Sequence, residues 1–244
     1  MVDVKPNHLI KVKRSQRLAF TLLSLAAAFT VLILFAIIFY VMSQGLSVIS
    51  MEFLLDSPRK MGKEGGVFPA IVGTIYLVGL IIVIAAPIGV GTAVYLNEYV
   101  SEGPFKKVVR FATELLAAIP SIVHGMFGFI FFVIILGDYT GGWSILSGAL
   151  TGVIMILPII IRASEEALRT VPDSLKEGSL ALGTTRWYTI KKVVLPLAIP
   201  GITTSIILSI GRVIGETAAF LLTIGGSLLL ATSVFDGART LALH

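Results

Sequence analysis

The chain has 244 residues, of which 56% are hydrophobic and 14% are charged, and its formal net charge is +5. A water-soluble domain needs roughly a quarter of its residues charged to cover its surface. The composition therefore excludes a soluble globular protein. The long apolar blocks also exclude a disordered tail and a nucleic-acid-binding domain, in spite of the positive charge. The chain is predicted to be an all-α integral membrane protein.

Apolar segments predict five transmembrane helices, since about 20 apolar residues cross a hydrocarbon core of ~30 Å. The first covers residues 18–43 after a polar tail at residues 1–17, and it is too long and begins too late for a cleaved signal peptide. An external loop at residues 44–67 precedes the membrane core, residues 68–244. In this core we expect spans at residues 68–96, 111–136, 143–161 and 197–222. The first of these four is interrupted at Pro87 and the second is broken at Pro120, and such prolines more often mark kinks or packing adjustments than gates.

The basic residues predict the orientation of these spans, because loops rich in Lys and Arg stay on the cytoplasmic side. Fourteen of the 19 lie in the tail and in the loops after the second and fourth spans, four lie in the other loops, and Arg212 lies inside a span. We therefore expect a cytoplasmic N-terminus. The residues after 235 resemble the approach to another helix, so we expect a sixth span to be missing from the C-terminal end of this chain.

Motifs for catalysis, metal binding or nucleotide binding do not occur in the sequence. The chain has no Cys, and its three His are far apart, so we expect neither a disulfide nor a metal site. It has no G-x-x-x-x-G-K-[ST] loop, no G-x-S-x-G elbow and no H-E-x-x-H pair. We expect no catalytic residue, and any ATP that the protein uses is expected on another chain.

The cytoplasmic loop at residues 162–196 is patterned like a folded element. Pro172 favours a new helix start, Gly183 suits a left-handed C-cap, and a second short helix is expected to end at Pro196. Two helices that meet at a glycine make a compact elbow. Trp187 is an amphipathic side chain of the kind found at interfaces. From the residues alone, the loop is either a hairpin on the membrane surface or a docking surface for a partner.

Within this loop, Glu177-Gly178-Ser179 is followed after three residues by Gly183 and after nine more by Val193-x-Leu195-Pro196. This spacing resembles the E-A-A-x3-G-x9-I-x-L-P signature of permease subunits of binding-protein-dependent ABC importers, with small or conservative changes at three positions. The resemblance implies a polytopic helical bundle of the type I importer (MetI-like) permease fold. It also implies that the loop couples to an ATPase through Glu177, Gly178, Ser179, Gly183, Arg186, Trp187, Leu195 and Pro196.

Four further segments resemble the phosphate permeases of this family, particularly the PstA-type subunit: residues 87–98, 119–128, 157–167 and 211–218. The resemblance implies a multi-pass transport subunit, itself no enzyme, in the cytoplasmic (inner) membrane of a prokaryote. It implies a homologous second permease, a pair of cytoplasmic ATPases that bind ATP and Mg²⁺, and an extracytoplasmic phosphate-binding protein. Membrane lipid would surround the spans, and no nucleic-acid partner is expected.

Two charged residues, Arg212 and Glu216, fall inside the predicted fifth span, where a charge costs at least ~2.5 kcal/mol and is usually functional. Four residues apart, they are expected on one helix face, about 6 Å apart along the axis, with Arg212 roughly 17 Å into the bilayer. A guanidinium suits phosphate oxygens. A carboxylate accepts a hydrogen bond from protonated phosphate and repels sulfate. We expect both in the substrate path, with Arg162 as a third candidate; the alternative is a salt bridge that serves packing.

Other functions remain open at this level. The chain could carry another oxyanion or small solute, or could be a secondary transporter that uses Arg212 and Glu216 as a substrate and proton site. A membrane scaffold is a third possibility, but it leaves the charges in the span unexplained. No inverted repeat is visible, which disfavours the secondary transporter. His124 is assigned no role, and Glu98 and residues 106–110 are interpreted as a solvated cytoplasmic face.

Overall fold

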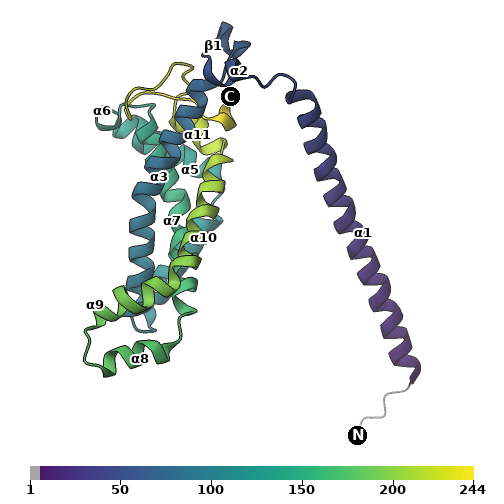
Figure 1. The fold of residues 1–244 in the computed structure, drawn as a ribbon, viewed down its shortest axis with the longest axis vertical. Helices are drawn as coiled ribbons and strands as arrows, with labels where there is room; N and C mark the ends of the chain where they lie inside the picture. Colours follow the sequence, from purple (N-terminus) through teal and green to yellow (C-terminus); the bar gives the residue numbers. More distant parts are fainter. Residues whose placement is uncertain (1–5) are drawn as a thin grey trace. The chain divides into compact units, whose positions relative to one another are not determined.

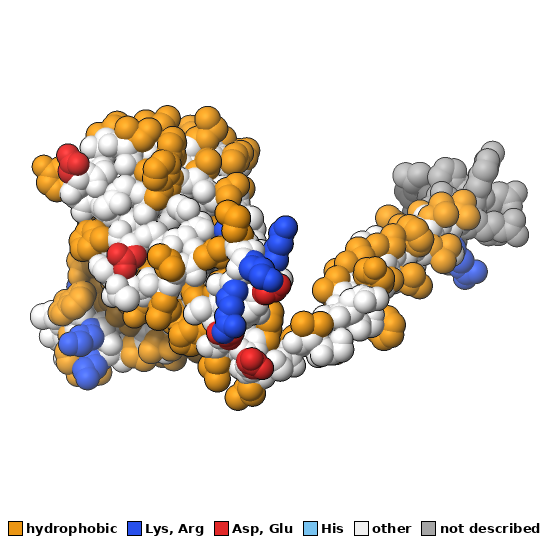
Figure 2. Space-filling model, turned by 90° about the horizontal axis from the view of Figure 1, so that it is seen from above, with side chains coloured by type: hydrophobic (Ala, Val, Ile, Leu, Met, Phe, Trp, Pro, Cys, Tyr) orange, Lys and Arg blue, Asp and Glu red, His pale blue; other side chains and the backbone are white. Residues whose placement is uncertain are grey.

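A computed structural model describes residues 6–244, with side chains from Gln16 onward. Lys5 lies outside the described residues, as do the side chains of Lys11, Lys13 and Arg14, which contribute to the predicted orientation. The chain divides into two compact units, Met1–Leu54 and Leu55–His244. The first unit is dominated by α1 (Pro6–Gly45), which begins before the predicted first span. From Gln16 onward, apolar side chains make up much of the visible face of this helix, at the right in Figure 2, as expected for a membrane-spanning segment.

The second unit is mostly helical after a short hairpin (Figure 1). The hairpin follows α2 (Met51–Leu55), which crosses the boundary between the units, and pairs Pro58 with Gly65 and Arg59 with Glu64. The elements are β1 (Pro58–Arg59), η1 (Lys60–Gly62), β2 (Glu64–Gly65), α3 (Phe68–Val94), η2 (Tyr95–Tyr99), α4 (Pro104–Ala118), α5 (Ser121–Gly128), η3 (Phe129–Ile135), α6 (Gly137–Thr140), α7 (Ile145–Arg169), α8 (Asp173–Ala181), α9 (Arg186–Thr189), η4 (Ile190–Val194), α10 (Leu195–Ile214), α11 (Ala218–Thr223) and η5 (Leu241–Leu243). Of these, η2, η3 and η4 are π-helical, and η1 and η5 are 3₁₀ turns.

Helix α7 forms the centre of this unit, with α3 and α10 packed against it. One apolar cluster joins Leu77 and Ile81 of α3 to Ile156 and Ile160 of α7 and to Phe220 of α11. A second cluster lies nearer the other end of α3 and includes residues of α3, α7, η4 and α10: Ala93, Val94, Ala167, Leu168, Ile190, Val194, Ala198 and Ile202. The order of the apolar blocks in the sequence therefore yields one helical bundle with two neighbouring patches of core.

Small residues let the helices of this bundle approach closely. A Cβ atom at Gly128 would lie 2.9 Å from the Cβ of Thr151 on α7, and closer still to the hydroxyl of that residue. Glycine at such crossings brings two backbones together, which is a common basis of helix association in membranes.

The predicted third span, residues 111–136, is broken at Pro120 as expected, and the break is a sharp bend. Helix α4 and the segment Ser121–Ile135 meet at an angle of 97° around Pro120. Ile119 is extended and Pro120 supplies no backbone N–H, so the helical hydrogen bonding stops there. In the described residues, four helices are long and apolar enough to cross a membrane, and this bent pair would make a fifth.

The predicted fifth span, residues 197–222, is also broken. Helix α10 ends at Ile214, Gly215 is its C-cap, and the separate short helix α11 begins at Ala218. The chain then continues in an irregular segment that packs back onto the bundle, where the backbone N–H of Leu241 donates to the hydroxyl of Thr74 (2.9 Å). The stretch expected to approach another helix forms a single 3₁₀ turn, Leu241–Leu243.

Candidate functional site

Residues 173–194 form the predicted turn between two helices at one end of the bundle, and we call this segment the elbow (Figure 1). Helix α8 begins directly after Pro172, and its chain reverses at Gly183, whose φ is +80°. This left-handed conformation favours glycine. No atom lies within 4 Å of a Cβ built at Gly183, so the backbone conformation alone accounts for the residue. The predicted helix–glycine–helix arrangement is confirmed.

Three hydroxyl groups hold the elbow in shape. Ser179 Oγ lies 2.9 Å from both Thr184 Oγ1 and Thr189 Oγ1, and the two threonine oxygens are 3.0 Å apart. Thr184 also donates to the backbone carbonyl of Ser179 (2.8 Å). These bonds join α8, the Gly183 turn and α9. Sequence reasoning did not identify Thr184 and Thr189, since their spacing shows no pattern until the turn is folded.

The outer surface of the elbow is open. Trp187 is 60% exposed and Leu182 is 85% exposed. Glu177 and Gly178 are exposed as well, and nothing lies within 4 Å of a Cβ built at Gly178. The elbow thus presents large apolar and amphipathic groups outside the bundle core, a composition typical of protein interfaces.

The helix after the turn does not end at Pro196. A single helical segment runs from Arg186 to Ile214, through α9, η4 and α10. In the π-helical turn, the backbone N–H of Leu195 donates to the carbonyl of Ile190, one residue further back than in an α-helix. Pro196 has no backbone N–H to donate, and the π-helical shift in hydrogen bonding lies directly before this residue. Leu195 is half-buried and Pro196 is exposed, so both belong to the root of α10.

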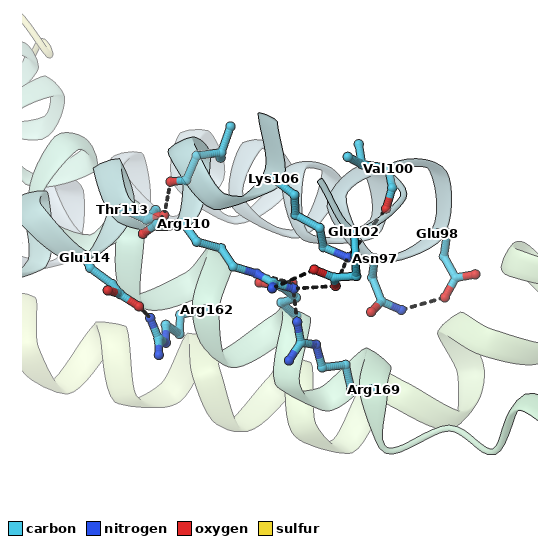
Figure 3. A network of polar contacts seen from close by, with 12 residues as sticks. Asn97, Glu98, Val100, Glu102, Lys106, Arg110, Thr113, Glu114, Arg162 and Arg169 are labelled. Carbon is cyan, nitrogen blue, oxygen red and sulfur yellow. Dashed lines mark hydrogen bonds and ion pairs between the residues drawn. The ribbon is translucent and has the colours of Figure 1, made fainter. Parts of the chain in front are cut away.

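A network of ion pairs fastens α4 to the adjoining end of α7 (Figure 3). Arg110 lies 2.5 Å from the carboxylate of Glu165, and Arg169 approaches the same carboxylate at 3.0 Å. Glu102 accepts from Lys106 (2.9 Å), and this contact holds the pKa of the Glu102 carboxyl below its usual range. Lys106 is only 4% exposed. The interpretation of this segment as a solvated face is therefore wrong for Lys106 and Arg110, which bind neighbouring carboxylates.

A second contact connects the elbow to η2. Lys176 Nζ of α8 lies 3.0 Å from Glu98 Oε1, and Glu98 is 7% exposed. Asn97 Nδ2 donates to the same oxygen at 2.7 Å. The guanidinium of Arg186 lies 5.2 Å from the centre of the Tyr99 ring, within cation–π distance. Glu98 is a buried partner of the elbow, and its interpretation as solvated is also wrong.

Arg162 lies two turns before the end of α7 and pairs with Glu114 of α4. Its side chain is largely exposed, as is that of Glu114. The pair borders an apolar groove of about 690 Å³ between α4 and α7. Sequence reasoning placed Arg162 among the candidate residues without a partner, and the fold supplies one 48 residues away in the chain.

The prediction that Arg212 and Glu216 share one helix face is wrong. Arg212 lies in the last turn of α10, and Glu216 lies beyond the helix end. The Glu216 carboxylate accepts from the backbone N–H of Ala219 at 3.3 Å, so it caps the start of α11. Among residues 16–244, neither side chain forms a salt bridge.

Arg212 lies on a face of α10 that the rest of the unit leaves uncovered. Thr204, Leu208, Gly211 and Arg212 are all exposed, and we call them the open face of α10. Ser205, Ser209 and Val213, on the adjoining side of the same helix, are buried. A Cβ built at Gly211 would meet no atom within 4 Å. Gly211 therefore makes no close contact with another helix within the described part of this chain.

Within the described residues, no group of three or more His, Asp or Glu side chains could hold a metal ion. The arrangement offers an exposed elbow at one end of the bundle and, on α10, a cation that no acidic side chain of the described chain neutralises.

Comparisons with known proteins give the family. Residues 85–236 match the family described as "Binding-protein-dependent transport system inner membrane component". The chain is 39% identical over 214 residues to the probable ABC transporter permease protein YqgI of Bacillus subtilis, covering 87% of this chain and 71% of that protein. It is 44% identical over 173 residues to the phosphate transport system permease protein PstA 1 of Mycobacterium tuberculosis, covering 71% of this chain and 56% of that protein.

The fold is shared with a solved bacterial ABC transporter that imports the acidic polysaccharide alginate. The TM-score is 0.60 at 16% identity, over 89% of this chain and 83% of that one. This likeness confirms the predicted helical importer fold. Because the family match covers more than half of the sequence, the chain belongs to the inner-membrane components of binding-protein-dependent transport systems.

Proposed function

We propose that this chain is a transmembrane subunit of an ATP-driven importer that carries inorganic phosphate across the cytoplasmic membrane. Its family and its similarity to a phosphate permease support this proposal. The observation that carries it is Arg212 on the open face of α10, which is exposed and has no salt-bridge partner among residues 16–244.

An arginine side chain on an apolar helix limits which groups can lie next to that side chain in the membrane. An arginine at depth in a bilayer costs at least ~2.5 kcal/mol, so it faces water, another protein chain or an anion. Among residues 16–244 no carboxylate pairs with Arg212. A path between the open face of α10 and a second permease would place the guanidinium beside the passing substrate. Its planar fork of donors matches the oxygens of phosphate.

Glu216 lies four positions after Arg212, but it caps α11 and leaves the guanidinium free. In the proposed path its carboxylate accepts a hydrogen bond from a protonated phosphate oxygen and repels sulfate. Arg162 has Glu114 as a partner and is a weaker candidate for substrate contact.

The elbow serves as the docking surface for an ATPase. Two such cytoplasmic subunits would bind ATP with Mg²⁺ and hydrolyse the ATP, while this chain would catalyse no reaction. The elbow and the N-terminus would then face the cytoplasm, and the opposite end of the second unit would receive phosphate from an extracytoplasmic binding protein. The chain works by favouring the inward-facing or the outward-facing state in turn.

The test is uptake of radiolabelled phosphate into proteoliposomes that hold the permease pair and the ATPases, with binding protein outside and ATP inside. Arg212→Ala is expected to reduce uptake by on the order of a hundredfold, as for a lost charge-assisted contact of about 3 kcal/mol. Arg212→Lys keeps the charge and is expected to retain part of the activity. Arg17→Ala, which removes an exposed arginine from α1, is the matched control.

Uptake that persists in excess sulfate and collapses in Arg212→Ala supports the proposal. An Arg212→Ala complex that assembles and transports normally removes Arg212 from the path. If the unmodified complex hydrolyses ATP but moves another oxyanion in place of phosphate, the importer remains and the proposed cargo is wrong.

A further inference from the structure

The elbow is connected to the bundle in two different ways. Along the chain, α9 continues through η4 into α10, so any movement of the elbow reaches α10 directly. Across space, α8 faces η2 over a polar cavity of about 540 Å³, whose lining includes Asn97, Asp173 and Arg186. Side chains that cross this gap therefore form the contact between α8 and η2.

Lys176 and Glu98 make that crossing. Their charged atoms are 3.0 Å apart, and both side chains are mostly buried, with exposures of 18% and 8%. Such a pair is screened little by solvent, unlike the surface pairs of the hairpin. Asn97 orients the Glu98 carboxylate from one side, and Asp173 lies 3.3 Å from Lys176 on the other.

Glu98 is well placed to pass a movement on. It belongs to η2, the π-helical turn that continues α3 without interruption from Phe68 to Tyr99. π-Helical turns are rare and are frequent at functional sites. Helix α3 packs along α7 through Leu77 and Ile81, so a displacement of η2 would act on the centre of the bundle.

We infer that the Lys176–Glu98 ion pair is a latch that transmits the movement of the elbow to α3, alongside the covalent route into α10. This role, which rests on the proposed function, makes Lys176 and Glu98 positioning residues. They touch no substrate, and they fix how far α3 follows when the ATPases close.

If the Lys176–Glu98 pair is a latch, breaking it is expected to uncouple phosphate import from ATP hydrolysis while the transporter still assembles. In the reconstituted complex, Glu98→Gln keeps the acceptor for Asn97 and removes the charge. The ratio of phosphate imported to ATP hydrolysed is expected to fall about five- to tenfold, a usual size for coupling between sites. Lys176→Gln is expected to act likewise, and Lys176→Arg to restore the ratio. Glu102→Gln makes the same charge change four residues further on, without touching the elbow, and is expected to leave the ratio unchanged.

A cross-link separates a latch from a merely structural pair. The chain has no cysteine, so a Glu98→Cys and Lys176→Cys double variant carries the only two thiols in it. Before cross-linking, the ratio is expected to be low. A short bifunctional thiol reagent that joins the two positions is expected to restore it.

Two results would overturn the latch: an assembled Glu98→Gln complex with an unchanged ratio, or a cross-linked variant that remains uncoupled. Retention of the ATPases on purification shows that assembly is intact. Failure of the unmodified complex to import phosphate would instead refute the proposed function, so the two failures are distinguishable.

Discussion

The hydroxyl oxygen of Ser179 lies 2.9 Å from that of Thr189, so one hydrogen bond joins α8 to α9 across the Gly183 turn. Thr189 is nearly inaccessible to solvent. A hydrogen bond shielded from water fixes the angle between two short helices better than an exposed one. The elbow is therefore a preformed surface and not a flexible hairpin.

Replacing Thr189 with valine removes this bond at almost constant shape. The loss is expected to destabilise the elbow by about 1 kcal/mol, the usual net contribution of a hydrogen bond. Faster backbone hydrogen exchange at residues 173–194 would report it. Thr203→Val, on an exposed position of α10, is the control and should leave exchange in the elbow unchanged. If hydrogen exchange at residues 173–194 is as slow in Thr189→Val as in Thr203→Val, the hydroxyl groups of Ser179, Thr184 and Thr189 do not hold the elbow in shape.

Substitution of Gly183 tests the turn. Gly183→Leu forces a side chain into the left-handed region and is expected to cost roughly 1–2 kcal/mol. Gly183→Asn is tolerated better, because asparagine adopts this conformation more readily. The amount of ATPase that co-purifies is expected to fall for leucine and to stay near the unmodified level for asparagine. Identical retention in both variants would contradict the importance of the turn.

Gly128, at the end of α5, and Gly79, inside α3, should respond in opposite directions to substitution by alanine. Gly128→Ala drives a methyl group into Thr151 of α7 and is expected to destabilise the protein by about 1–3 kcal/mol. Gly79→Ala meets no atom within 4 Å and should stabilise α3 by up to about 1 kcal/mol. Thermal unfolding in detergent measures both. A Gly128→Ala protein as stable as the Gly79→Ala protein would refute the close crossing.

His124 is 5% exposed, and neither ring nitrogen has a hydrogen-bond partner among residues 16–244. A buried polar group without a partner costs about 1–3 kcal/mol. His124→Leu removes this cost and is expected to leave the unfolding temperature equal or higher. A clear fall would mean that the imidazole binds a water molecule or another chain in the assembled transporter.

Asp236 closes a loop outside the spans by accepting backbone N–H bonds from Thr232 and Ser233. These bonds hold the pKa of its carboxyl below the ordinary value of 3.8. The lowered pKa means that the carboxylate stabilises the loop above pH 3.8. This stabilisation is lost as the pH falls through the folded-state pKa. The protection of the Thr232 and Ser233 amides, taken as the intrinsic exchange rate at each pH divided by the observed rate, should be high at neutral pH and fall under acid. In Asp236→Asn this protection should be lower already at neutral pH.

Much of the fold could be predicted from the sequence, because apolar blocks and prolines act locally. The turn at Gly183 and the start of α8 after Pro172 follow from residues that restrict their own backbone. Pro120 predicts a break within residues 111–136, but the 97° size of the bend could not be predicted, since hydropathy runs on through these residues and does not distinguish a mild kink from a right-angle turn.

The polar contacts of the candidate site were harder to predict. Arg110 and Glu165 are 55 residues apart, and Lys176 meets Glu98 across a cavity that only the folded bundle creates. The Arg212–Glu216 pair depended on an unbroken helix, and the helix end at Gly215 separates the two side chains. Short-range spacing indicates which residues are unusual, but the fold decides which of them meet.

The helix from Arg186 to Ile214 runs without a break through η4, while α9 and α10 point in different directions (Figure 1). The helix is therefore bent near η4, and its two arms would move together. Arg212 lies 17 residues beyond Leu195, or about 26 Å at the usual helical rise. A rotation of about 10° at the bend would carry the guanidinium by roughly 4 Å, which is more than a hydrogen bond can stretch. A small displacement of the elbow at the membrane surface would thus suffice to make or break a contact of Arg212 within the bilayer.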